Sequence, residues 1–161
     1  MTGFEPPPSG RLIGMARRAA KRAPMETLER GRIGVECGLE GDFRGVRRPG
    51  KLPNRQVTIL AREGWEAACA ELGRRLPWTT RRANLLVEGI RLPRCVGDVL
   101  AIGDVRLEIT VEVEPCERME EAAPGLQVAM RPDWRGGVGC RVLAGGYVAI
   151  GDEIWIEETS R

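Results

Sequence analysis

The residue with the clearest chemical potential in this sequence is Cys116, which stands at the end of a strongly patterned segment. Residues 105–116 read VRLEITVEVEPC, and apolar and polar residues alternate without a break from 105 to 113. Such alternation is typical of a half-buried strand. Pro115 has no N–H to donate and ends the ladder. We therefore expect the strand to deliver the Cys116 thiol to a sheet edge or a barrel rim.

The chain contains no histidine, and this absence limits the chemistry of every other residue. Imidazole catalysis, Ser-His and Cys-His pairs and His-based metal sites are all excluded. The cysteines are Cys37, Cys69, Cys95, Cys116 and Cys140. They form no C-x-x-C pair and no zinc-ribbon spacing. A metal bound by the protein would therefore use Cys, Asp, Glu or backbone oxygen.

Length and cysteine usage bound the class of protein. A chain of 161 residues predicts one domain, here over residues 11–161, after a poorly ordered lead-in over residues 1–10 that contains three consecutive prolines. An odd, scattered set of cysteines without a signal peptide is typical of a reducing compartment. The sequence has no apolar run of about 18 residues, the length that would predict a membrane span. We therefore expect a cytoplasmic protein with no membrane partner.

Short apolar segments between glycine turns predict a mostly-β sandwich or barrel with few helices. We expect strands at residues 11–15, 32–37, 56–60, 85–87, 99–102, 105–113, 127–130, 141–143 and 153–156. One helix is expected over residues 63–72, where apolar residues recur at helical spacing and Gly73 provides a stop. That spacing places Cys69 on the buried face of the helix.

Arginine accounts for all but two of the 25 basic residues, and the arginines cluster at residues 44–55 and 74–82. A guanidinium fork suits a planar or phosphorylated anion, although codon bias could produce the same abundance. The basic segment 17–25 could be a solvated loop or one wall of such a site. Nucleic acid is the competing partner, but few aromatic residues interleave with the clusters, so we do not expect it.

Several motifs, taken in order, make the sequence resemble the MOSC domain family, named after the C-terminal part of molybdenum cofactor sulfurases. They are GLEGD at 38–42, RRANLLVEG at 81–89, VGDVLAIGDVRLEIT at 96–110, EPC at 114–116, RGGVGCRVL at 135–143 and GGYVAIGDEI at 145–154. The resemblance spans roughly residues 11–156. It implies a closed, strongly bent β-barrel with a few peripheral helices.

The resemblance also implies a link to the molybdenum cofactor. Relatives act as sulfur carriers during cofactor maturation or as cofactor-bound reductases of N-hydroxylated compounds. It implies that Cys116 is the catalytic thiol and the ligand to molybdenum, in keeping with the reactivity and softness of a thiolate. The residues expected to hold the cofactor are Arg44, Arg81, Arg82, Asn84, Gly136, Gly137 and Arg141. Among these, Arg44, Arg82 and Arg141 are expected to face the thiol.

Cys140 is a candidate second thiol, because it follows a glycine-rich loop that could approach a phosphate. It could resolve an oxidised or persulfidated Cys116. The alternative is a core position on a strand.

One departure from the family bears on mechanism. Many relatives carry a histidine soon after the Gly-Asp of GLEGD, whereas this chain has Phe43 and Arg44 there. Arginine donates hydrogen bonds but cannot accept them, so proton shuttling at this place is not expected.

The chain also shows no pyridoxal-phosphate domain and no flavin or iron–sulfur motif. We expect a sulfur donor or an electron donor protein as a partner, such as a molybdoenzyme. The alternative function is a non-catalytic binding module for the cofactor or another phosphorylated anion.

Overall fold

Strand β8 (Val105–Glu112) forms where the alternation predicts it and lies in the middle of the main sheet. The side chains of Val105, Leu107 and Ile109 are fully buried, and the polar residues between them are partly exposed. β8 pairs antiparallel with β7 (Val99–Ile102) and β9 (Val138–Ala144). The strand that leads to Cys116 is therefore held on both edges.

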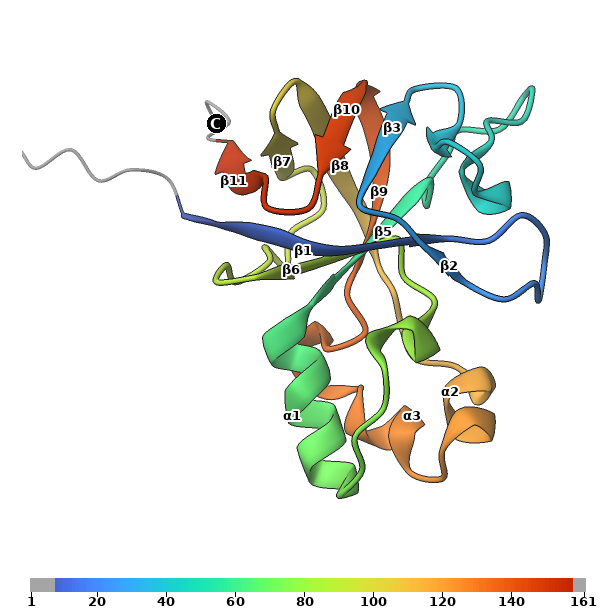
Figure 1. The fold of residues 1–161 in the computed structure, drawn as a ribbon, viewed down its shortest axis with the longest axis vertical. Helices are drawn as coiled ribbons and strands as arrows, with labels where there is room; N and C mark the ends of the chain where they lie inside the picture. Colours follow the sequence, from blue (N-terminus) through green and yellow to red (C-terminus); the bar gives the residue numbers. More distant parts are fainter. Residues whose placement is uncertain (1–7, 158–161) are drawn as a thin grey trace, which may run out of the picture.

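Seven strands close into a barrel in the computed structural model, which describes residues 8–157 (Figure 1). The remaining barrel strands are β1 (Ser9–Arg17), β5 (Val57–Ala61), β6 (Leu85–Glu88) and β11 (Glu153–Glu157). Their order is β11-β7-β8-β9-β5-β6-β1, and the pairing of β1 with β11 closes the ring. Of the neighbouring barrel strands, β5 and β6 run parallel and the others antiparallel. The predicted fold class is confirmed.

Aliphatic side chains fill the barrel interior. Those that are essentially inaccessible to solvent include Leu12, Ile59, Leu85, Leu100, Leu107, Ile109 and Ile154. A second sheet of β3 (Arg30–Gly34), β4 (Gly38–Leu39) and β10 (Gly146–Ala149) packs onto the same core. A two-residue strand β2 (Glu26–Thr27) extends the barrel at β1.

Parallel strands need a crossover connection, and helix α1 (Arg62–Leu72) supplies it between β5 and β6. The predicted helix is confirmed, with Trp65, Ala68 and Cys69 buried. Gly73 ends it in the left-handed region at φ 72°, where glycine has no steric penalty.

Helices α2 (Glu117–Ala122) and α3 (Leu126–Ala129) pack with α1 around a second core on the outer side of β5 and β6. In Figure 1 the three helices lie together at one end of the molecule, and β3 and β10 lie toward the other. The predicted strand at 127–130 is wrong, because this segment begins in α3. Leu126, Ala129 and Met130 are buried at helical spacing, and a run this short shows no decisive period.

Three short 3-10 helices complete the described chain: η1 (Phe43–Gly45), η2 (Trp78–Arg81) and η3 (Pro132–Trp134). Within residues 8–157, no helix has the length and apolar character needed to cross a membrane. Residues 1–7 of the predicted lead-in lie outside the described residues. Ser9 and Gly10, the last two residues of that segment, belong to β1.

The barrel core should dominate stability. Leu107→Ala removes a fully buried side chain from the barrel and should lower the free energy of unfolding by about 2–5 kcal/mol in urea denaturation. Val96→Ala is the control, because that side chain is 63% exposed and its loss should change the same quantity by about 0.5 kcal/mol or less. Equal losses in the two variants would contradict this assignment of the core.

Candidate functional site

A cavity of about 180 Å³ lies where the barrel meets η2 and α2. We call it the arginine cleft. Its wall combines one thiol, from Cys116, and one carboxylate, from Asp42, with six guanidinium groups. The arginines are Arg18, Arg44, Arg55, Arg81, Arg82 and Arg118. Thr58, Asn84 and Met119 complete the lining.

Cys116 reaches this cleft from the end of β8. After Pro115 the chain turns, and Cys116 is the residue that precedes α2. The side chain is exposed. The structure thus brings the predicted thiol together with four predicted cofactor-binding residues, namely Arg44, Arg81, Arg82 and Asn84.

Arg81 is the most deeply set cation of the cleft, with only 7% of the residue exposed. Its Nε donates to the Gly136 carbonyl at 3.1 Å, and its Nη2 donates to the Val113 carbonyl at 2.9 Å. The pKa of Arg81 is lowered to about 10, mainly by burial and also by the charge of Arg55, while Cys116 acts in the opposite direction. The guanidinium therefore stays charged at neutral pH, close enough to the thiol to interact with it electrostatically.

The predicted glycine pair acts behind the cleft rather than in its lining. A Cβ added at Gly136 would lie 2.0 Å from the Val113 carbonyl oxygen and 3.1 Å from Arg81 Nη2. A Cβ at Gly137, where φ is +94°, would lie 2.2 Å from the Ile59 carbonyl oxygen. The absence of side chains lets this loop approach β8 and β5 and hold Arg81 from behind.

Asn84 holds three strands together. Its Oδ1 accepts the Thr58 backbone N–H at 3.0 Å and the Thr58 hydroxyl at 3.3 Å, and its Nδ2 donates to the Ala16 carbonyl at 3.2 Å. The side chain is buried, and protein groups engage both ends of its amide. In this structure Asn84 therefore fixes the cleft floor between β1, β5 and β6.

Arg82 adopts a left-handed backbone conformation, with φ 63°, and its Nη2 donates to the Ala23 carbonyl. Burial lowers the pKa of Arg82, and Arg118 adds to this effect. The buried Nε atoms of Arg82 and Arg55 have no hydrogen-bond partner among residues 8–157. A buried donor without a partner is costly; Arg62 and Arg141, outside the cleft, also carry such an Nε.

The outer wall of the cleft is built around Phe43. The guanidinium carbons of Arg18 and Arg44 lie 5.2 and 5.8 Å from the centre of its ring, within the range of cation–π attraction. Asp42 accepts the backbone N–H of Arg18 at 3.0 Å. The pKa of Arg18 is lowered to about 10, mainly by burial and also by the charges of Arg82 and Arg44, while Asp42 acts in the opposite direction.

Sequence reasoning missed five lining residues that carry polar groups: Arg18, Asp42, Arg55, Thr58 and Arg118. Signals existed for Arg18, which lies in the basic segment 17–25, and for Arg55, which lies in the first arginine cluster. Arg118 stands two residues after Cys116 in the first turn of α2.

Two predicted residues lie elsewhere. Arg141 pairs with Glu108 across β8 and β9, on strand positions that alternate with buried ones, and it does not line the cleft. Cys140 belongs to the barrel core with no exposed surface, and burial raises the pKa of its thiol. The structure thus places Cys140 in the alternative core position, out of contact with the cleft.

The described chain offers little for a metal bound by several side chains. No group of three or more Cys, Asp or Glu side chains suitable for a metal ion occurs within residues 8–157. A metal brought to the arginine cleft would meet the Cys116 sulfur there.

Comparison with known protein families matches residues 41–155 to the MOSC domain. This match covers most of the sequence, so the chain belongs to the MOSC domain family. The matched region contains Arg44, Arg81, Cys116 and Gly136, although Arg18 lies before it.

Solved structures share the fold at low sequence identity. The YUAD protein from Bacillus subtilis superposes with a TM-score of 0.77 at 20% identity, over 94% of this chain and 97% of that chain. YiiM from Escherichia coli gives 0.68 at 16% identity, over 93% of this chain and 71% of that chain. YiiM from Geobacillus stearothermophilus gives 0.65 at 16% identity, over 92% and 73%. A comparison with curated proteins gives no match.

The cysteine thiols should differ in their rates of alkylation. Iodoacetamide added to the native protein should modify Cys116 first, because its side chain is exposed in the cleft. Cys140 should react only after denaturation, even at pH 9, because burial raises its pKa and blocks access. Peptide mass spectrometry over time measures both rates. Native-state modification of Cys140 at the rate of Cys116 would contradict the structure.

The glycine behind Arg81 should be required for its placement. Gly136→Ala forces the loop away from Val113 and should destabilise the protein by about 1–3 kcal/mol, the usual cost of overpacking. Gly64→Ala in α1 is the matched control, because its added Cβ would have no neighbour closer than 3.6 Å. That change should leave stability equal or raise it by about 0.5–1 kcal/mol. Chemical denaturation compares the two variants.

Proposed function

We propose that this MOSC domain binds the molybdenum cofactor in the arginine cleft. The Cys116 thiolate either carries a sulfur atom to the metal or ligates the metal. The observation that carries this proposal is an exposed thiol in a cavity where six guanidinium groups meet a single carboxylate. Such a site favours an anionic ligand that can also react with thiolate sulfur or be coordinated by it.

The residues present fit the chemistry of this cofactor. Its phosphate is an anion of the kind that guanidinium groups recognise with paired hydrogen bonds. The buried Nε atoms of Arg55 and Arg82 lack partners within the described chain. A soft thiolate suits a sulfur-loving metal. When bound, the cofactor would supply a metal centre that accepts sulfur or electrons.

Each residue of the cleft has a distinct task under this proposal. Arg81 is fixed by two carbonyl groups and supplies a charge whose position does not depend on the ligand. Arg55 and Arg82 supply free donors, and Arg118 supplies a further charge beside Cys116. Because binding does not have to place the Arg81 guanidinium, no ordering entropy is lost for that side chain.

Transfer of sulfur to Cys116 from a persulfide requires no additional oxidant. The Cys116 thiolate attacks the outer sulfur of a persulfide on a donor protein. A new S–S bond forms on Cys116, the S–S bond of the donor breaks, and the electron pair leaves with the donor thiolate. The reaction needs a donor protein, because nothing in the cleft provides a way to release sulfur from free cysteine.

The cleft is poorly equipped for proton transfer. Arginine cannot accept a proton under ordinary conditions, and the carboxylate of Asp42 is buried and already accepts the N–H of Arg18. The lining contains no histidine. Anion binding and sulfur transfer are the chemistry that these groups support best.

Cofactor content should depend on the thiol and on the cleft arginines. After co-expression with a cofactor pathway, Arg82→Ala should retain at least tenfold less releasable pterin, since a charge-assisted hydrogen bond is worth about 1.5–3 kcal/mol. Cys116→Ser should lose molybdenum or cyanide-labile persulfide sulfur while keeping its fold. Metal analysis, pterin fluorescence and circular dichroism measure these outcomes.

The control is Arg141→Ala, which also removes one positive charge but breaks only a pair outside the cleft. It should keep wild-type content of metal and pterin. Unchanged loading in Cys116→Ser would remove the thiol from the mechanism. Equal loss in the Arg82 and Arg141 variants would show that only overall charge matters.

A further inference from the structure

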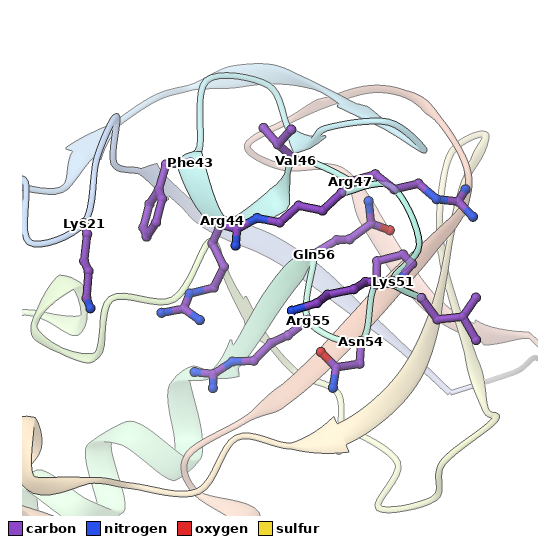
Figure 2. Close-up of a pocket in the computed structure, with 12 residues that line it drawn as sticks. Lys21, Phe43, Arg44, Val46, Arg47, Lys51, Asn54, Arg55 and Gln56 are labelled. Carbon is purple, nitrogen blue, oxygen red and sulfur yellow. The ribbon is translucent and has the colours of Figure 1, made fainter.

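A second hollow, of about 370 Å³, adjoins the arginine cleft and is lined by the loop between η1 and β5 (Figure 2). We call it the basic basin. Its positively charged side chains are Lys21, Arg44, Arg47, Arg48, Lys51 and Arg55, and no acidic residue lines it. Its other walls are Phe43, Val46, Leu52, Pro53, Asn54 and Gln56.

The charges of this basin are uncompensated. Seven arginines elsewhere in the described chain pair with carboxylates, for example Arg32 with Glu36 and Glu40. None of those seven lines the basin or the cleft. None of the six cations in the basin has an ion pair with a carboxylate of residues 8–157. Like charges gathered without acids repel one another, so this surface gains from an anionic ligand.

The basin and the cleft are adjacent and share part of their walls. Arg44 and Arg55 line both hollows. Figure 2 shows Lys21, Arg44 and Arg55 extending toward the same side. If one anionic group of a ligand lies in the cleft, the part of the ligand that extends out of the cleft would contact these shared arginines and then the basin.

We propose that the basin takes the second phosphate, and the organic group attached to it, of a pyrophosphate-linked ligand whose first anionic end lies in the cleft. Resting on the proposed function, this assigns a nucleotide-bearing form of the cofactor to this chain. A volume of about 370 Å³ is within the range of small-molecule pockets. Leu52 and Pro53 offer apolar faces to a base or sugar, and Leu52 is 76% exposed.

A single ligand with two phosphates fits these hollows better than a nucleic acid strand does. Among the residues that line the basin, Phe43 is the one aromatic side chain, and Arg18 and Arg44 already lie over its ring. Strand-binding proteins use successive aromatic platforms for successive bases. The charges here instead surround two adjoining cavities of limited volume.

Calorimetric titration of the cofactor-free protein tests the proposal, with inorganic phosphate and adenosine diphosphate as probes at fixed ionic strength. Adenosine diphosphate should bind at least tenfold more tightly than phosphate. The double variant Arg48→Ala, Lys51→Ala should remove this advantage and leave phosphate binding within twofold of wild type, because neither residue lines the cleft. Equal affinity for the two probes in wild-type protein would overturn the proposal.

The matched control is Arg74→Ala, Arg75→Ala, which removes the same charge from the segment after α1, outside both hollows. It should keep the preference for adenosine diphosphate. Loss of the preference in both double variants would show that net charge alone is responsible. Displacement of adenosine diphosphate by a lower concentration of a short single-stranded oligonucleotide would assign the basin to nucleic acid instead.

Protection of Cys116 separates this inference from the function on which it rests. Bound adenosine diphosphate should slow iodoacetamide modification of Cys116 at least fivefold, because one phosphate occupies the cleft. Binding without protection would mean that the basin is an independent site, and the inference would fail. Loss of molybdenum and pterin in the Cys116→Ser and Arg82→Ala variants would still support the proposed function in that case.

Discussion

The pair of hydrogen bonds that Arg81 donates to the carbonyls of Gly136 and Val113 is the interaction on which the site depends. A buried charge is costly unless hydrogen bonds replace its hydration. These two bonds join η2 to the end of β8 and to the loop before β9. They therefore fix Arg81 against the segment that leads to Cys116, and Gly136 leaves the space for this contact.

The second constraint is electrostatic. The ion pairs between arginines and carboxylates of residues 8–157 all lie outside the arginine cleft, as in the pair of Arg141 with Glu108. In the arginine cleft a single acid, Asp42, faces six guanidinium groups, and burial with mutual repulsion lowers the pKa of Arg18, Arg55 and Arg81. The fold holds these charges in place at a cost that an anionic ligand offsets, which is why anion binding is the property that the geometry supports most directly.

Patterns with a clear period were predictable, and those that depended on distant partners were not. The alternation of β8 and the helical spacing of α1 appear in the structure because each is set by local sequence and one apolar face. The segment 127–130 was predicted as a strand, but contacts of α3 with α1 and α2 decide its conformation. Arg141 and Cys140 lie on opposite faces of β9. Arg141 pairs with Glu108 and Cys140 packs in the barrel core, and in both cases the contacting residues are distant in sequence.

The sequence by itself determined which chemistry is possible: a chain without histidine, rich in arginine, with one thiol presented at the end of an alternating strand. Only the tertiary structure decided which arginines meet that thiol. Arg18, Arg55 and Arg82 lie in separate segments of the chain, and the pairing of β6 with both β1 and β5 brings them to one cavity. The sequence gives each side-chain type directly, but electrostatic fields and cavities depend on residues that are neighbours only in space.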